Sequence, residues 1–211
     1  AELCCLVETY PAKHDTYEDY VKTLKIAYLY GKTVTLVNTH WPETNAIMLK
    51  NRRIGLSMSG VIQAFNKHSR RELLNWCDRA YDHVHDLDHQ YSDWFCVPRS
   101  VRMTSIKPSG TVSLLNGSTP GIHYPEDEYY IRRIRFSKTS EFVDILRDAG
   151  YTVEDDVYSP NTACVEFPVH EPFFVRGKRG VSMWEQLEIA AQFQHFWADN
   201  SVSVTVTFKP E

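Results

Sequence analysis

Several features that would assign this sequence to a simple class are missing from it. No run of apolar residues is long enough to span a bilayer, and no signal peptide opens the chain. A large excess of one charge is also missing, since the formal net charge is −4 at pH 7. A weakly acidic chain has little non-specific affinity for nucleic-acid phosphates. We therefore expect no membrane partner and no nucleic-acid partner.

Cysteines at metal-binding spacing are missing as well. The sequence holds five cysteines but no C-x-x-C pair, so no metal ligand is predicted. Their number is odd and two of them are adjacent, which argues against a disulfide framework. Free thiols of this kind predict a reducing compartment, the cytoplasm. The five residues are Cys4, Cys5, Cys77, Cys96 and Cys164.

The chain does contain enough apolar sequence for one domain with a core. Its 211 residues are 43% hydrophobic and 24% charged, which is ordinary for a globular protein. Segments with helical and with strand periodicity alternate, without an internal repeat or a low-complexity linker. This alternation predicts an α/β fold.

Capping residues and apolar periodicity predict where the elements lie. Ser69 and Ser182 each precede a glutamate by three residues, which is the capping-box pattern of a helix start, and Asp15 or Thr16 caps an earlier helix. Helices are expected over residues 17–37, 59–65, 69–95, 111–116, 140–149 and 182–197. Strands are expected over residues 3–8, 99–106, 163–169 and 201–208, with Pro168 closing the third, and residues 53–57 form a brief apolar segment that ends in small residues.

A loop with the composition of an anion site lies near the middle of the chain. It reads K-P-S-G-T-V-S over residues 107–113, between an expected strand and a short helix. Backbone N–H groups at such a junction, with serine and threonine hydroxyls, can bind a phosphate, and a glycine lets the backbone come close to it. The loop is neither a Walker loop nor a G-x-G-x-x-G turn. An ordinary turn with a helix cap is the alternative.

Four sequence blocks, in a fixed order, carry a resemblance to a known family. They are ELCCLVE (residues 2–8), RRIGLSMSG (52–60), the loop with its continuation SLLNGSTPGIH (113–123), and WADNSVSVTVTF (197–208). Together they resemble the C-terminal half of the catalytic chain of ribonucleotide reductase, over essentially the whole chain. The loop reads P-S-G-T at residues 108–111, which is similar to the adenosylcobalamin-dependent class that reduces ribonucleoside triphosphates. The di-metal class typically reads P-T-E-S-S-S there.

The resemblance implies an α/β fold that is part of a ten-stranded barrel of the ribonucleotide reductase type. The first and last ten residues read as core rather than as polar termini. We therefore expect residues 1–211 to form a single partial domain, the C-terminal portion of the catalytic barrel. The N-terminal half and a C-terminal cysteine tail would lie outside it.

The resemblance also implies two sets of site residues. In the C-x-L context of its strand, Cys4 would be one member of a redox-active cysteine pair. Adjacent strand residues face opposite ways, so only one of Cys4 and Cys5 can face the site, and a buried structural thiol is the alternative for each. The substrate phosphates would be bound by the loop residues Pro108, Ser109, Gly110, Thr111, Val112 and Ser113.

The implied reaction converts ribonucleotides to 2′-deoxyribonucleotides for DNA synthesis. A thiyl radical takes the 3′-hydrogen, and two thiols are oxidised to a disulfide as the 2′-hydroxyl leaves as water. Adenosylcobalamin would be the radical source, with a thioredoxin-like dithiol as reductant and the remainder of the catalytic chain as partner. The N-x-C-x-E motif of the radical cysteine is not in this sequence, so the piece alone is expected to be inactive. A non-catalytic nucleotide-binding or assembly module and a di-metal reductase are the alternatives.

Other candidate clusters are expected to be structural. Cys164 and Glu166 share a strand face but follow the loop, where the family has a peripheral strand. The His/Asp run over residues 82–89 is expected to be a solvated helix face. We expect Arg132, Arg133 and Arg135 to form a surface patch, and Asp199-Asn200 to stabilise a turn between a helix and a strand.

Overall fold

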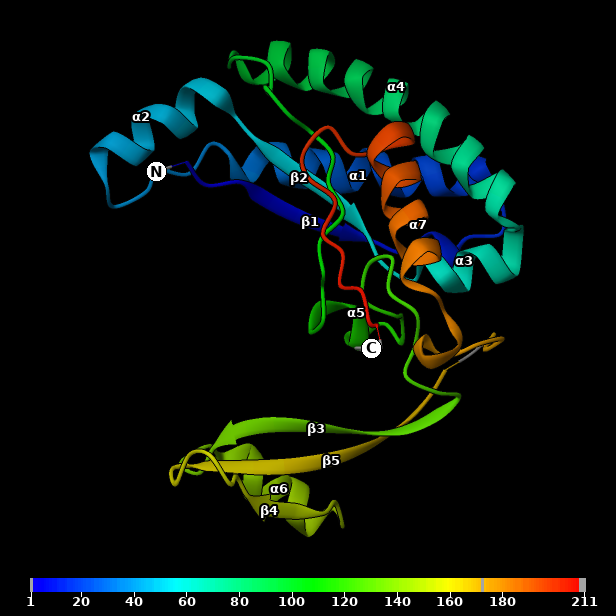
Figure 1. Ribbon diagram of the computed structural model, residues 1–211. Coiled ribbons are helices and arrows are strands. Elements are labelled where there is room, and N and C mark those ends of the chain that lie inside the picture. The colour runs from blue at the N-terminus through cyan, green and yellow to red at the C-terminus, as the bar shows by residue number, and fades with distance from the viewer. Residues whose placement is uncertain (1, 172, 209–211) are drawn as a thin grey trace.

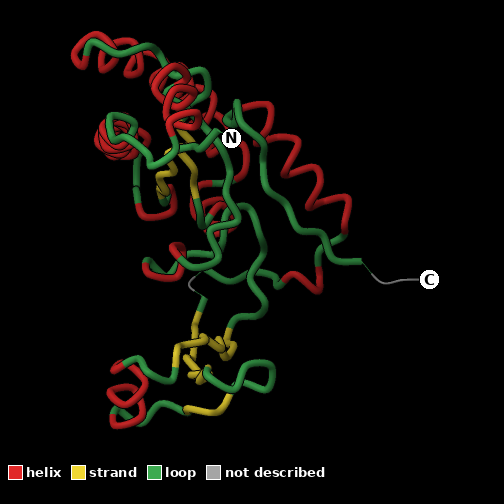
Figure 2. The backbone as a smooth tube through the Cα atoms, turned by 90° about the vertical axis from the view of Figure 1, so that its left-hand side faces the viewer, coloured by secondary structure: helices red, strands yellow, loops and turns green. Residues whose placement is uncertain are grey.

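The structure, a computed structural model, describes residues 2–171 and 173–208. It has two parts (Figure 1). In one part, here called the body, parallel strands pack against helices; the other, here called the subdomain, is a small antiparallel sheet with one helix that projects from the body. Figure 2, which is turned by 90°, shows the same separation of the two parts.

The body is built on two parallel strands, β1 (Cys5–Thr9) and β2 (Ile54–Met58). Their register runs from Cys5↔Ile54 to Thr9↔Met58. Beyond β2, Leu56 bridges to Thr104 and Ile106 bridges to Val202, both in parallel. Four neighbouring extended segments therefore run in one direction, and their carboxyl ends meet at one edge.

The predictions of regular strands over residues 99–106 and 201–208 were wrong, because only isolated bridges form there. Side chains take the backbone groups that a ladder would use. The Asp199 carboxylate accepts hydrogen bonds from the N–H groups of Met103 and Thr104, at 3.0 and 2.9 Å. The N–H of Val202 donates to the Gln194 side chain at 3.1 Å.

Five of the body's helices are α1 (Tyr17–Val34), α2 (Pro42–Asn51), α3 (Val61–His68), α4 (Arg70–Phe95) and α7 (Met183–Phe196). The predicted caps are confirmed, since Thr16, Ser69 and Ser182 each accept a hydrogen bond from the N–H three residues on. Short single turns cover Pro11–Lys13, Val112–Leu115 (α5) and Lys178–Gly180. Within the described residues, no helix is both long enough and apolar enough to cross a membrane.

A buried ion pair lies between α1 and α4. Lys32 Nζ is 2.7 Å from Asp88 Oδ1, and the two side chains are 0% and 3% exposed. The hydroxyl of Tyr28 and the N–H of Ser100 also donate to this carboxylate. The prediction of a solvated face for the His/Asp run was wrong at Asp88, because this residue follows Val84 by four positions on the buried stripe of α4.

The subdomain has the strand order β3-β5-β4, all antiparallel, with one helix. Its elements are β3 (Tyr129–Ser137), α6 (Glu141–Asp148), β4 (Val153–Asp155) and β5 (Thr162–His170). Pro168 does not close β5 as predicted. It pairs with Ile131 of β3, and β4 no longer flanks β5 there, so the missing N–H of proline leaves no ladder bond unmade.

The chain enters and leaves the subdomain at neighbouring points. Tyr129 pairs with His170 at the first position of the β3–β5 ladder, and their rings stack at 4.6 Å. One residue outward, the N–H of Glu171 donates to the carbonyl of Glu128 at 2.9 Å. The two connections to the body are thus held together.

Candidate functional site

One face of the β1–β2 pair carries polar side chains. Along β1 and the residue before it, Cys4, Leu6 and Glu8 alternate onto the same side. The register sets Leu6 opposite Gly55 and Glu8 opposite Ser57. This face, here called the site face, therefore holds a thiol near the amino end of the strands and a carboxylate near their carboxyl ends.

The opposite face packs against α1. A Cβ built on Gly31 of α1 would lie 3.1 Å from Val7 Cγ2 and 3.3 Å from Ile54 Cγ2. Cys5 lies on this same side and is buried, and burial raises the pKa of its thiol. The sequence left open which adjacent cysteine faces the site, and the structure puts Cys4 on the site face and Cys5 toward the helix.

The Cys4 thiol lies over a glycine. A Cβ built on Gly55 would come within 3.2 Å of Cys4 Sγ and 3.5 Å of Ser105 Cβ, so only a residue without a side chain leaves the sulfur this space. Burial, followed by the neighbouring Cys5, raises the pKa of the Cys4 thiol to about 11. Cys4 is therefore a neutral S–H group near pH 7, suited to giving up hydrogen rather than to attack as a thiolate.

Polar groups tie the carboxyl ends of the strands to the loop. The carboxylate of Glu8, whose side chain is 4% exposed, accepts hydrogen bonds from Ser57 Oγ at 3.2 Å and Ser59 Oγ at 2.5 Å. Lys107 Nζ lies 3.6 Å from Glu8 Oε2, and the N–H of Lys107 donates to Ser57 Oγ at 2.9 Å. This network fixes where the loop over residues 107–113 begins, here called the phosphate loop after its predicted ligand. The loop lies outside the carboxyl ends of parallel strands, where ligands bind in open α/β sheets.

The phosphate loop presents a row of backbone N–H groups without acceptors. The N–H and the hydroxyl of Ser113 both donate to the carbonyl of Ser109, at 3.2 and 2.6 Å, and this closes the loop. Ser109 has a left-handed φ of +48°, which is strained for a residue with a side chain. Within the described residues, the N–H groups of residues 109–112 make no hydrogen bond, and the buried hydroxyl of Ser109 has no partner. Such a concavity of amides is suited to an anion.

The helix after the loop contributes less than the sequence predicts. The α5 helix is a single turn of 4 residues, so its dipole is short. The capacity to bind an anion therefore comes from the individual N–H groups and hydroxyls of the loop.

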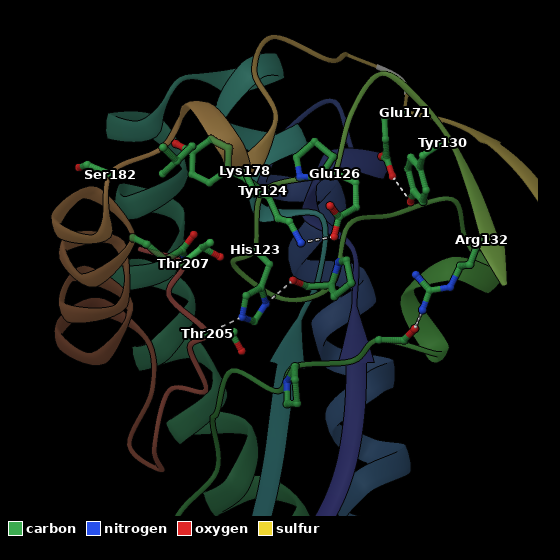
Figure 3. Close-up of a pocket in the computed structure, with 16 residues that line it drawn as sticks. His123, Tyr124, Glu126, Tyr130, Arg132, Glu171, Lys178, Ser182, Thr205 and Thr207 are labelled. Atoms are coloured by element: carbon green, nitrogen blue, oxygen red, sulfur yellow. Dashed lines mark hydrogen bonds and ion pairs between the residues drawn. The ribbon is translucent and has the colours of Figure 1, made fainter. Parts of the chain in front are cut away.

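A cavity of about 320 Å³ opens beside the loop (Figure 3). Inside it, Lys178 is paired with Glu126, and the hydroxyl of Tyr130 donates to Glu171 at 2.7 Å. His123 bonds Pro120 O through Nδ1 and accepts from Thr205 N–H at Nε2, which fits the neutral ring. The cavity is lined by Pro108 and Gly110 of the loop, Tyr130 and Arg132 of β3, Glu171, and residues of the segments 120–126, 178–186 and 205–207.

Arg132 departs from the expected surface patch. Its Nη2 donates to the carbonyl of Gly110 at 2.5 Å, which joins β3 to the phosphate loop. Arg133 and Arg135 fit the prediction better, since both are more than half exposed and form ion pairs within the subdomain.

The remaining candidates make contacts that stabilise the fold. No group of three potential metal ligands is found among the described residues. Cys164 is buried and accepts a hydrogen bond from Arg133 at 3.4 Å. Asp199 ties the turn after α7 to the segment before the loop, and Asn200 donates to the carbonyls of Ile54 and Thr104.

Sequence reasoning missed several residues of the site. Strand alternation from Cys4 could have found Glu8, which lies four residues on. The roles of Gly55 and Ser57 depend on the register with β1, and the contact of Arg132 joins residues 22 apart in the chain. No local pattern carries that contact.

Comparisons with known proteins agree on one family. No family model matches the chain. The chain is 52% identical over 209 residues to a probable adenosylcobalamin-dependent ribonucleoside-triphosphate reductase of Dictyostelium discoideum, and 52% identical over 211 residues to an adenosylcobalamin-dependent ribonucleoside-triphosphate reductase of Euglena gracilis. The alignments cover 99% and 100% of this chain but 28% and 29% of those proteins. The chain thus spans less than a third of the length of these curated relatives.

Two solved structures share the fold. A crystal structure of a B12-dependent (class II) ribonucleotide reductase matches with a TM-score of 0.82 and 31% identity, over 98% of this chain and 33% of that chain. The class Id ribonucleotide reductase alpha subunit of Actinobacillus ureae matches with a TM-score of 0.60 and 12% identity, over 92% of this chain and 42% of that one, which shows the fold alone. The predicted fold class, part of an α/β barrel of this type, is confirmed.

Proposed function

The chain belongs to the ribonucleotide reductase family over the portion of those proteins that it spans, and from this premise we propose that it is part of a catalytic chain that reduces ribonucleotides. The substrate would be a ribonucleoside triphosphate, the class in the names of the relatives. The product would be a 2′-deoxyribonucleotide for DNA synthesis. Residues 1–211 would form a single partial domain of the barrel, completed by the remainder of the parent chain.

One observation carries the proposal. The site face presents the neutral Cys4 thiol, and the phosphate loop follows the carboxyl ends of the same sheet. From Cys4 to Glu8 the strand rises about 13 Å, a separation that a nucleoside polyphosphate can bridge. The sugar would lie against Cys4 while the phosphates reach the loop.

The phosphate site remains the set proposed from the sequence, residues 108–113. Pro108 begins the turn, and Ser109, Gly110, Thr111 and Val112 supply N–H groups that lack another acceptor in the described structure. Ser113 contributes by closing the loop onto Ser109. Hydrogen bonds from several amides to an ionised phosphate are charge-assisted and so are strong.

Cys4 would act as one of two thiols in the reduction. Two S–H groups give two electrons and two protons; the C2′–O bond breaks, oxygen leaves as water, hydrogen replaces it at C2′, and an S–S bond forms. The second thiol would come from the remainder of the parent chain. A thioredoxin-like dithiol would then reduce the disulfide, in a reducing compartment such as the cytoplasm, and the described cysteines are all free thiols.

Adenosylcobalamin is proposed for the parent enzyme from the names of the relatives. The residues beside the loop do not fit it. Their cavity of about 320 Å³ lies at the small end of the range for drug-sized ligands, whereas a corrinoid is far larger. We therefore assign the cofactor site to other parts of the parent and derive no step through it.

The test is a reduction assay on the full-length parent chain, with a dithiol, with and without adenosylcobalamin. We expect cobalamin-dependent turnover in the wild type, loss of multiple turnover in Cys4→Ser because serine cannot form the disulfide, and near-normal turnover in the matched control Cys5→Ser. Loss only in Cys5→Ser would contradict the assignment of Cys4. Turnover without cobalamin would favour the di-metal class. Absence of turnover from folded parent protein would favour a non-catalytic nucleotide-binding module.

A further inference from the structure

We infer that Arg132 is a positioning residue for the phosphate loop. It holds the carbonyl of Gly110 so that the next amide, the N–H of Thr111, faces the substrate phosphate. The inference rests on the proposed function and deepens it, because it adds a residue of the subdomain to the phosphate site.

The three arginines of β3 separate onto two faces of the strand. Arg133 and Arg135 point one way and form ion pairs with Glu154 at 2.5 Å and Asp156 at 3.0 Å. Arg132 points the other way, lines the cavity beside the loop and forms no ion pair within the described part of the chain. Its charge is therefore directed at the loop rather than at an acidic partner.

The contact of Arg132 orients a peptide group. Figure 3 shows the guanidinium reaching the loop, where Nη2 donates to Gly110 O at 2.5 Å. The described chain has no cis peptide bond, so the carbonyl of Gly110 and the N–H of Thr111 point in opposite directions. A donor fixed on the carbonyl thus turns the Thr111 N–H away from Arg132. On the other side of the loop, Tyr10 pins the carbonyl of Val112 at 3.1 Å.

The loop needs such a support. A Cβ built on Gly110 would meet nothing within 4 Å, so neither a side chain nor packing restricts this residue. The neighbouring Ser109 has a left-handed φ of +48° and a buried hydroxyl without a partner. An anchored carbonyl lowers the number of conformations the loop must give up when a phosphate binds, and so raises the affinity.

The experiment uses the full-length parent enzyme and four variants. Arg132→Met removes the donor, Arg132→Lys keeps a charged donor, and Arg132→Gln serves if circular dichroism shows that Arg132→Met is unfolded. Arg133→Met is the matched control, since it removes a neighbouring arginine from the opposite strand face. KM and kcat are measured for a ribonucleoside triphosphate and diphosphate, and Kd for inorganic tripolyphosphate is measured by calorimetry.

We expect Arg132→Met to raise KM and the tripolyphosphate Kd about tenfold, with kcat within about twofold, as for loss of one charge-assisted hydrogen bond. In Arg132→Lys, KM and the tripolyphosphate Kd should lie within about threefold of the wild-type values. In the control Arg133→Met, both should equal the wild-type values. The defect should be equal for triphosphate and diphosphate, because the oriented N–H serves both.

Three results would overturn the inference: unchanged KM and Kd in folded Arg132→Met, a fall in kcat at constant KM, or a defect confined to the triphosphate, which would make Arg132 a direct ligand of the terminal phosphate. The tripolyphosphate measurement separates this inference from the proposed function. If the wild type binds tripolyphosphate but reduces no nucleotide, only the proposed function fails. If the wild type does not bind it, the inference fails as well.

Discussion

One ion pair of the body and one of the subdomain lie at opposite extremes of burial. In the body, Lys32 and Asp88 are almost completely buried as a pair. In the subdomain, Arg147 and Asp144 pair on the surface of α6 with side chains 56% and 80% exposed. Burial fixes charges in one geometry, whereas exposed charges stay solvated and mobile. The body, with its buried charges, carries the candidate site, and Arg132 connects the subdomain to the loop of that site.

The body and the subdomain also differ in how far their apolar side chains are buried. Leu56 and Met58 of β2 are 0% exposed, whereas Ile131, Phe142 and Ile145 of the subdomain are each more than half exposed. A three-stranded sheet with one short helix buries little apolar area. We therefore expect local unfolding to begin in the subdomain, and four comparisons test the difference between the two parts.

The largest difference in stability is expected for the two ion pairs. Lys32→Met leaves the Asp88 carboxylate buried without its cation, which lowers the free energy of unfolding by about 3–5 kcal/mol. Arg147→Met removes an exposed pair and costs less than about 1 kcal/mol. Hydrogen–deuterium exchange of α1 and α6 in the parent protein measures both effects. Equal losses of unfolding free energy in Lys32→Met and Arg147→Met would show that the two ion pairs do not differ in their contribution to stability.

Glycine substitutions come next. A Cβ on Gly55 would lie 2.7 Å from Leu6 Cδ2 and 3.2 Å from Cys4 Sγ, so Gly55→Ala costs about 1–3 kcal/mol by crowding. It also displaces the Cys4 thiol from its buried position, which lowers its pKa and speeds its alkylation by iodoacetamide. In the subdomain, a Cβ on Gly150 would meet nothing within 4 Å, but Gly150 has a φ of +88°. Gly150→Ala should therefore lower the stability by about 1–2 kcal/mol through backbone strain. Mass spectrometry of alkylated Cys4 should detect a change only for Gly55→Ala.

A pH effect of about 1.4 kcal/mol per pKa unit is expected from the buried pair. Burial alone would raise the pKa of Asp88, but hydrogen bonds from Lys32 and Tyr28 outweigh it and hold the pKa below its usual value. The unfolded chain therefore binds a proton where folded Asp88 does not, and stability is lost as pH falls below about 4. Exchange protection of α4, measured down to about pH 3, should fall less steeply in Asp88→Asn. If protection fell equally steeply with pH in the wild type and in Asp88→Asn, Asp88 would not be the source of the pH effect.

The smallest difference is expected at the helix caps. Ser182 of the body accepts a hydrogen bond from the Glu185 N–H at 3.1 Å, whereas Ser140 before α6 makes no side-chain cap bond. Ser182→Ala should cost about 1 kcal/mol and Ser140→Ala only a few tenths. Exchange rates in the first turns of α7 and α6 measure the two costs. A larger effect at Ser140 would show that the subdomain depends on its caps after all.

The sequence predicted best what short-range patterns encode. The caps Thr16, Ser69 and Ser182 and the helices behind them were found because a cap needs only its next three residues. The strand β3 was missed because its arginines interrupt the apolar alternation in Y-Y-I-R-R-I-R-F. The strand predicted over residues 201–208 has real alternation, but a strand also needs a partner, and no sequence window shows one.

The candidate site also contains residues that local sequence patterns predict and residues that they do not. Alternation separated Cys4 from Cys5 in principle, and the loop composition indicated an anion site. The buried position of Asp88 and the contact of Arg132 with Gly110 depend on which elements pack together, over 56 and 22 residues of chain. Such contacts are properties of the folded chain rather than of any segment.

The stacked pair of Tyr129 and His170 has a consequence for engineering. Because the chain departs and returns at one point, the subdomain is an insertion whose ends already meet. A short turn could replace residues 133–166, between the paired residues Arg132 and Phe167, or a reporter domain with close termini could be grafted there, without lengthening any connection in the body and without removing Arg132.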